Sequence, residues 1–215
     1  MEFVLVIKRY DLFDLSFPHG FVAAADDDRV ERWSKRIREK SFFVERRWAE
    51  QDSTLKQVIP YVVMAHGDEV FLLKRLDTGG EARLHGKLSI GVGGHINPVD
   101  EAGSDAGSGS GGDPDDVLDA GCRRELEEEL AIDTTIELTP RGVINDESGD
   151  VGSVHFGLVQ VARCASTAVA IRETDQLEGS WIGRDALAEL ADKQGDRFET
   201  WSKMIIDRLP ALLDG

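Results

Sequence analysis

The chain has few cysteines and no long apolar run, and each shortage excludes a class of protein. Its two cysteines, Cys122 and Cys164, are too few for a disulfide framework or a zinc cluster. No apolar run approaches the roughly 20 residues that span a bilayer. The amino terminus has no basic segment followed by an apolar stretch and a cleavage site. We therefore expect a cytoplasmic protein with two reduced, structural thiols.

Basic residues are also scarce. The chain has 25 lysines and arginines against 41 acidic residues, which gives a net charge of −16. Such a surface repels a phosphate backbone, so we expect no nucleic-acid partner. Small phosphorylated substrates stay open, because a bound cation can reverse the sign of the local field.

The pattern along the 215 residues predicts one domain over 1–215, with residues 1–55 as an amino-terminal extension packed on it. Apolar runs predict strands, and apolar residues at helical spacing predict helices. The expected strands are 2–8, 58–64, 70–74, 88–92, 135–138, 154–161 and 168–171, and the expected helices are 28–39, 113–130, one beginning near 184, and a carboxy-terminal one with Phe198, Trp201, Ile205 and Leu209 in the core.

One stretch, residues 99–115, departs from this composition, because it is rich in glycine, serine and aspartate. It offers almost nothing to bury, so we interpret it as a flexible, solvated insertion. The aspartates do not have the spacing of a calcium loop. We expect residues 101–112 to be dispensable for folding.

The helix expected over 113–130 carries three carboxylates on one face. Glu125, Glu128 and Glu129 stand at i, i+3 and i+4, whereas Glu127 points roughly the other way. Like charges at this spacing destabilise a helix by roughly 0.2–0.5 kcal/mol per pair. A divalent cation would offset that cost, since clustered oxygen ligands suit magnesium or manganese. The alternative is a solvated acidic face, and spacing alone does not decide between them.

The wider pattern resembles the box of the Nudix hydrolase family, G-x5-E-x7-R-E-U-x-E-E-x-G-U, where U is a bulky aliphatic residue. Its matching residues are Gly94, which Gly93 precedes and His95-Ile96 follow, and then Arg124, Glu125, Leu126, Glu128, Glu129 and Ile132. The first box glutamate is an aspartate here, either Asp100 by counting forward from Gly94 or Asp116 by counting back from Arg124. Ala131 stands in place of the second glycine. The stretch 80–97 is also similar to a MutT-like phosphoesterase sub-branch.

The resemblance implies an α+β fold, the Nudix-type α/β/α sandwich with a mixed β-sheet. It implies a metal-dependent hydrolase that cleaves the diphosphate linkage of a nucleoside diphosphate linked to another group X. Mg²⁺ or Mn²⁺ would be held by Glu125, Glu128 and Glu129 with the carbonyl of Gly94 or Gly93. Glu128 or Glu129 could also act as base, and Arg124 would orient a glutamate. A homodimer is common in the family.

Members of the family often recruit a further glutamate from a later loop. Glu178 is the first candidate for a catalytic role, followed by Glu173 and Glu147, although each fits a surface carboxylate as well. Arg75 and Arg83 flank the expected cleft and suit phosphate contact, but surface ion pairs would explain them equally.

Two other functions stay open. One is an isopentenyl-diphosphate-isomerase-like enzyme on the same fold. The box keeps the glutamates of a hydrolase and neither cysteine has an obvious catalytic setting, and both facts argue against this enzyme. The other is a non-catalytic nucleotide-sensing module, which would typically lose box glutamates. The sequence does not name group X.

Overall fold

The computed structural model describes residues 1–14, 16–76, 85–104, 114–172 and 174–214. The strands are β1 (Phe3–Lys8), β2 (Gly20–Ala23), β3 (Phe42–Glu45), β4 (Leu55–His66), β5 (Glu69–Arg75), β6 (Leu88–Ser89), β7 (Val92–Gly93), β8 (Leu130–Ile132), β9 (Ile136–Asn145), β10 (His155–Cys164), β11 (Val169–Ile171) and β12 (Leu177–Gly183). The helices are α1 (Arg9–Leu12), α2 (Arg29–Lys40), α3 (Arg46–Ala49), α4 (Val99–Ser104), α5 (Pro114–Glu129), α6 (Asp150–Ser153), α7 (Arg184–Gln194), α8 (Thr200–Ile206) and α9 (Leu209–Leu213), with a 3₁₀ turn at Gly195–Arg197.

The main sheet is mixed and centres on β4 and β10. These two strands run parallel, from His155 opposite Gln57 to Arg163 opposite Ala65. The path of the sheet is β12-β5-β4-β10-β9-β2, with β10 antiparallel to β9 and β5 antiparallel to β12. Eleven of the twelve residues of β4 are buried, as expected for a strand covered on both faces.

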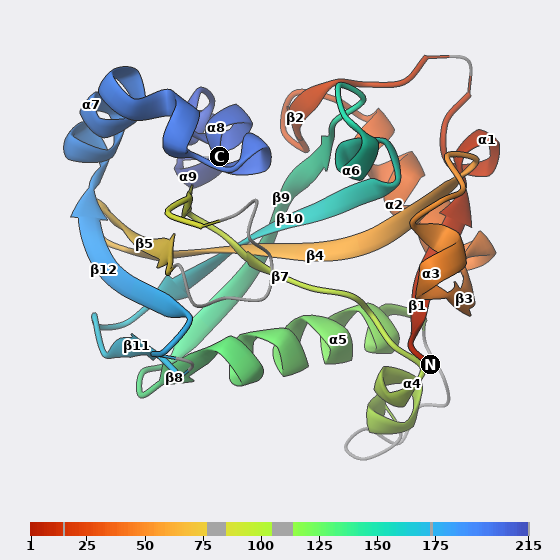
Figure 1. Ribbon diagram of the computed structural model, residues 1–215, viewed down its shortest axis with the longest axis horizontal. Helices are drawn as coiled ribbons and strands as arrows, with labels where there is room; N and C mark the ends of the chain where they lie inside the picture. The colour runs from red at the N-terminus through yellow and green to blue at the C-terminus, as the bar shows by residue number, and fades with distance from the viewer. Residues whose placement is uncertain (15, 77–84, 105–113, 173, 215) are drawn as a thin grey trace.

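Helices cover both faces of this sheet, as Figure 1 shows. On one face, Cys122 and Leu126 of α5, with Leu130 directly after the helix, pack against buried side chains of β4, β5 and β10. On the other, α7, α8 and α9 pack on a second cluster that includes Phe198, Ile205 and Leu209. The expected α/β/α sandwich with a mixed sheet is confirmed, and so is the core role of the carboxy-terminal apolar residues.

Residues 1–55 contribute to the same sheet. Val6 of β1 pairs with Gln57 of β4, and β3 pairs with β1. Trp33 and Ile37 of α2 are buried in a cluster shared with Val58 and Phe156. In the part of the chain that the structure describes, no helix is long and apolar enough to cross a membrane.

Two predicted elements differ from the structure. The strand expected over 88–92 is split into β6 and β7, because the backbone N–H of Ile90 donates to the Ser202 hydroxyl instead of a neighbouring strand. The loop expected over residues 99–104 is wrong, since this segment forms α4, and the Asp100 carboxylate closes its first turn on the N–H of Asn97. Residues 105–113 of the predicted insertion lie outside the described residues.

Candidate active site

The acidic face of α5 lies beside its buried stripe. Leu126 is 2% exposed and Leu130 fully buried, so the helix is anchored on the sheet as expected. The three glutamates differ in their surroundings. The Glu125 side chain is 14% exposed and that of Glu128 is 59% exposed. Glu129 is half-buried and lines a cavity. The three carboxylates of this face therefore differ in exposure, whereas those of a solvated helix surface would all be exposed.

Arg124 ties this face to the preceding loop. Its guanidinium donates to the Glu125 carboxylate at 2.8 Å and to the Glu128 carboxylate at 3.2 Å. It also donates to the carbonyl oxygen of His95 at 2.7 Å and to the Asp100 carboxylate at 2.8 and 3.1 Å. Arg124 thus orients one buried glutamate and fixes the segment that follows the paired glycines.

Gly94 brings its backbone against the Glu125 carboxylate. A Cβ on Gly94 would lie 2.0 Å from Glu125 Oε2, closer than any real contact allows. Only a residue without a side chain leaves this space open. Burial raises the pKa of Glu125, and the hydrogen bond from Arg124 opposes that rise. A partly buried carboxylate next to an open backbone position is a place where a cation can be held.

A narrow cavity of about 140 Å³ lies at the carboxyl end of this helix. Glu129 lines it together with Arg75, Tyr61, Leu177 and Glu199. Nε of Arg75 donates to the Glu199 carboxylate at 2.8 Å. An acidic and a basic side chain are therefore paired in the same cavity as a box glutamate.

Glu199 is a residue that sequence reasoning missed. It immediately precedes α8, and its backbone N–H donates to the carbonyl of Leu88 at 2.9 Å. Phe198 forms an isolated parallel β-bridge with Leu88. This contact carries the carboxy-terminal segment to the site, and the apolar pattern around Glu199 predicts only a core helix. No local signal in the sequence points to it.

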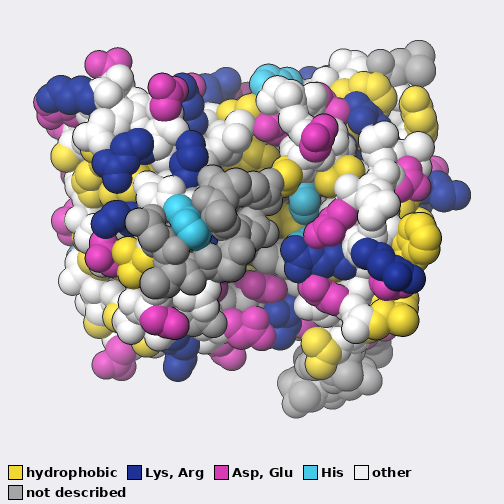
Figure 2. All heavy atoms as spheres, in the orientation of Figure 1, with side chains coloured by type: hydrophobic (Ala, Val, Ile, Leu, Met, Phe, Trp, Pro, Cys, Tyr) yellow, Lys and Arg dark blue, Asp and Glu magenta, His cyan; other side chains and the backbone are white. Residues whose placement is uncertain are grey.

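A wider cavity of about 650 Å³ adjoins the narrow one. The two share Ile59, Tyr61, Gly93, Glu199 and Trp201. The wide cavity then extends past Gly94 and His95 to α3 on one side and to α6 and His155 on the other. Figure 2 shows this side of the molecule, where acidic, basic and histidine side chains gather beside α6. The predicted site is therefore one part of a longer cleft.

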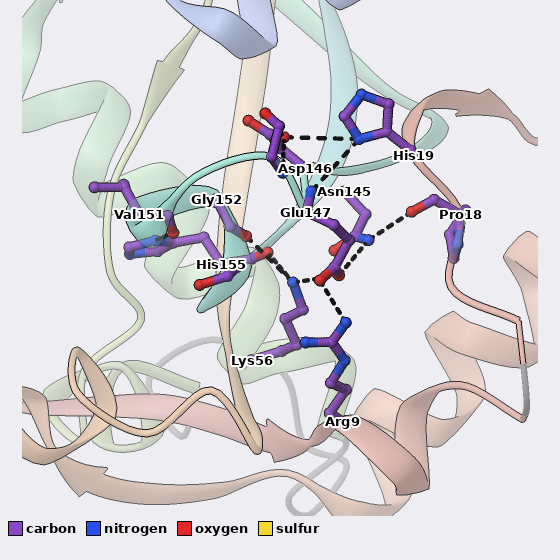
Figure 3. Close-up of polar contacts among 12 residues, drawn as sticks. Arg9, Pro18, His19, Lys56, Asn145, Asp146, Glu147, Val151, Gly152 and His155 are labelled. Atoms are coloured by element: carbon purple, nitrogen blue, oxygen red, sulfur yellow. Dashed lines mark hydrogen bonds and ion pairs between the residues drawn. The ribbon is translucent and has the colours of Figure 1, made fainter.

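A buried lysine holds the wall formed by α6, as Figure 3 shows. Lys56 is fully buried and pairs with the Glu147 carboxylate at 2.9 Å, and it donates to the carbonyls of Gly152 and His155. Glu147 also accepts hydrogen bonds from Arg9 and Asn145. Burial lowers the pKa of Lys56, which Glu147 opposes.

Of the three glutamates expected to assist from a later loop, the two that the structure describes form ion pairs elsewhere. The loop prediction for Glu178 is wrong, because this residue lies on β12 opposite Lys74 and pairs with it at 2.9 Å. Strand alternation turns Glu178 away from the face of Leu177, which lines the narrow cavity. Glu147 is engaged with Lys56, and Glu173 lies outside the described residues.

Of the two arginines expected to bind substrate, Arg75 lines the narrow cavity. Arg83 lies outside the described residues. Both cysteines are free and buried, as expected for structural thiols, and burial raises the pKa of Cys122 to about 12 and that of Cys164 to about 11. A thiol this hard to ionise is a poor nucleophile, which counts against cysteine-based isomerase chemistry.

The donor set fits a hard divalent cation, although it is not a closed cage. Among the described residues, no three His, Cys, Asp or Glu side chains are gathered closely enough to hold a metal by themselves. Magnesium does not need such a cage, because it is usually bound by one or two carboxylates together with substrate phosphates and water. The partly buried Glu125 beside the open backbone of Gly94 meets this requirement.

Comparison with known proteins agrees with the fold. No family model matches the chain. The chain is 38% identical over 214 residues to protein YmaB of Bacillus subtilis (strain 168), and the match covers 97% of each. Its structure resembles the crystal structure of Tm1382, assigned to the Nudix hydrolases, with a TM-score of 0.74 and 31% identity over 97% of this chain and 98% of that one. The chain therefore belongs to the Nudix hydrolase family, whose enzyme class is that of pyrophosphohydrolases.

Proposed function

We propose that this protein hydrolyses the diphosphate linkage of a nucleoside diphosphate joined to another group X, and that it uses a divalent cation. The observation that carries the proposal is the close approach of the Glu125 carboxylate to the backbone of Gly94. Nearby, Glu129 and Arg75 line the same narrow cavity. Carboxylates, an open backbone position and a guanidinium are the groups that a diphosphate and its cation need.

Glu125, Glu128 and Glu129 would hold Mg²⁺ or Mn²⁺, with the carbonyl of Gly94 as a further ligand. When bound, the cation would neutralise negative charge on the phosphate oxygens and make a bound water more acidic. Arg124 keeps Glu125 in place through its hydrogen bond of 2.8 Å. Because Glu128 is 59% exposed, it can turn toward a cation without breaking a buried contact.

Arg75 binds a phosphate oxygen of the substrate. In the structure its Nε donates to Glu199, and a phosphate with two free oxygens is a stronger bidentate partner for arginine. When substrate takes Arg75, the Glu199 carboxylate is released toward the same cavity. Binding of the diphosphate and exposure of a proton acceptor are then one event.

We assign to Glu199 the catalytic role that the sequence analysis expects of Glu178. Its carboxylate accepts a proton from the attacking water, whose oxygen bonds to phosphorus while the bridging P–O bond breaks. The products are a nucleoside monophosphate and the phosphate ester of X. A carboxylate engaged with a cation is a poor base, which is why a carboxylate across the cavity suits this step.

The proposal is tested by product release from a panel of nucleoside diphosphate derivatives, each with magnesium, with manganese and with a chelator. We expect release of a nucleoside monophosphate that stops on chelation and returns with metal. Turnover that is unaffected by the chelator would contradict the metal-dependent mechanism. The cytoplasmic location, the homodimer and the MutT-like assignment stay predictions from the sequence.

A further inference from the structure

We propose that the wide cavity takes group X, and that X is an uncharged or cationic group rich in hydroxyl or amine donors, such as a sugar or an amino sugar, and carries no second acid. This inference rests on the proposed function, because it concerns the same cleft. It is carried by the size of the two cavities and by the side chains that line the larger one.

The volumes decide where X can lie. The narrow cavity beside Glu129 and Arg75 holds about 140 Å³, which is the space of a few water-sized groups. The wide cavity holds about 650 Å³, within the range of ligand sites of roughly 300–1,000 Å³. Because the two meet at Gly93 and Glu199, a diphosphate in the narrow part can extend its substituent into the wide part.

Carboxylates outnumber cations around the wide cavity. Among its described lining residues, four are acidic, Glu50, Asp146, Asp150 and Glu199, and two are basic, Arg46 and Lys87. A second acid on X would therefore meet a net negative wall at short range, which is unfavourable at any realistic protein dielectric.

The two cations are already engaged within the protein. Arg46 pairs with Glu2 at 3.0 Å and with Glu50 at 2.8 Å. Lys87 donates to the carbonyl of Asp196 at 2.6 Å. An anionic X would have to compete with these partners, whereas hydroxyl or ammonium groups could donate to carboxylates of the wall.

His155 adds a further acceptor. Its Nδ1 lies 2.6 Å from the carbonyl oxygen of Val151, and since a carbonyl only accepts, Nδ1 carries the proton. Burial lowers the pKa of His155, which favours the neutral ring, and with the proton on Nδ1 the Nε2 atom is the acceptor. The Lys56–Glu147 pair holds the segment that places this ring in the wall.

Three sugar nucleotides test the inference, because they differ in a single group. UDP-glucose is the reference, UDP-glucuronate carries a carboxylate on the sugar, and UDP-glucosamine carries an amine. We expect kcat/KM to be about tenfold or more lower for UDP-glucuronate than for UDP-glucose, on the order of 1.4 kcal/mol. UDP-glucosamine should equal or exceed the reference. Equal or faster hydrolysis of UDP-glucuronate would overturn the inference and leave the hydrolase proposal standing.

Charge variants show whether the wall causes the discrimination. Glu50→Gln removes one acid and releases Arg46, and Asp150→Asn removes another. Each should raise relative hydrolysis of UDP-glucuronate by roughly three- to tenfold. Glu189→Gln on the exposed surface of α7 is the matched control and should change nothing. Discrimination that survives both wall variants would contradict the inference.

Binding measured in the Glu129→Gln variant separates the two proposals. If wild type hydrolyses no nucleoside diphosphate derivative of the panel but the affinities of the three sugar nucleotides for Glu129→Gln follow the same order, the hydrolase proposal fails and the inference about the cavity holds. If all three bind equally, or the carboxylate binds most tightly, the inference fails whatever the turnover.

Discussion

The Arg124 guanidinium donates to both oxygens of the Asp100 carboxylate, at 2.8 and 3.1 Å, across 24 residues of sequence. This contact links α5 to α4 on the other side of the glycine- and serine-rich stretch. Asp100 is the acid reached by counting forward from Gly94, and we propose on the strength of this contact that it is the box acid and that the box is interrupted after it. Its acid still reaches the arginine of the helix, because the two flanking helices bring the ends together.

Loss of the hydrogen bonds that the Arg124 guanidinium donates should lower the affinity of the site for its metal ion. We expect Arg124→Lys to raise the magnesium concentration needed for half-maximal activity by about 10–100-fold, since a lysine cannot hold Asp100, Glu125 and His95 at once. Arg123→Lys, an exposed neighbour on the same helix, is the control and should behave as wild type. An unchanged metal requirement in Arg124→Lys would show that the arginine has only a structural part.

The effect on kcat of replacing a glutamate of α5 should depend on the helix face that carries it. Glu128→Gln and Glu129→Gln should each lower kcat by roughly 10²-fold or more, the scale of a lost contribution to metal-assisted catalysis. Both proteins should stay folded or gain a few tenths of a kcal/mol, because one like charge is removed. Glu127→Gln lies on the same helix but off this face, and we expect wild-type kinetics. Thermal melts and initial rates at saturating magnesium make the comparison.

Glu199 and Glu178 give opposite expectations. Glu199→Gln keeps an acceptor for Arg75 but cannot take a proton, so kcat should fall by roughly 10²–10⁴-fold with little change in metal requirement. Glu178→Gln should stay within a factor of a few of wild type, because its carboxylate pairs with Lys74 away from the cavity. A loss of kcat in Glu178→Gln with none in Glu199→Gln would return the role to the residue predicted from sequence.

Replacing either member of the Lys56–Glu147 pair should lower the free energy of unfolding, by an amount that depends on which partner is removed. Glu147→Gln leaves a fully buried ammonium without its carboxylate and should destabilise the protein by roughly 3 kcal/mol. Lys56→Met removes the buried charge itself and leaves Glu147 with Arg9, so its cost should be less than half of that. Denaturant unfolding of both variants measures the difference, and a larger loss for Lys56→Met would contradict this view.

The same pair predicts a response to acid. Burial would raise the pKa of Glu147, but the bonds from Lys56 and Asn145 hold it below the ordinary value of 4.5. Its contribution is therefore complete above pH 4.5 and is lost as the pH falls through the lower, folded-state pKa. The stability gap between wild type and Glu147→Gln should be constant near pH 7 and close below pH 4.5.

Apolar periodicity predicts the main strands and helices because it is strong where the core is, whereas the expectation of an α/β/α sandwich came from the family resemblance. Strand β9 was underestimated, since Pro140 and Gly142 interrupt the pattern. The structure accommodates both at a bulge where the register with β10 shifts near Val159. Tertiary pairing there outweighs local propensity.

The sequence predicts the site residues that share one helix or one family motif, and it also places Arg75 beside the cleft. The spacing of Glu125, Glu128 and Glu129 sets their common face, and the box supplied Gly94. The position of Glu199 depends on a backbone contact with Leu88, far away in the sequence. The turn-rich composition around Glu178 predicts a loop, whereas pairing with β5 makes the segment a strand.

The most direct measurement is the rate of nucleoside monophosphate release from a sugar nucleotide, with wild type, Glu129→Gln and Glu127→Gln compared with and without magnesium. The account predicts turnover by wild type and Glu127→Gln that requires magnesium, and a loss of roughly 10²-fold or more in Glu129→Gln. Equal rates for Glu129→Gln and wild type, or turnover that persists in a chelator, would contradict the assignment of catalysis to the acidic face of α5.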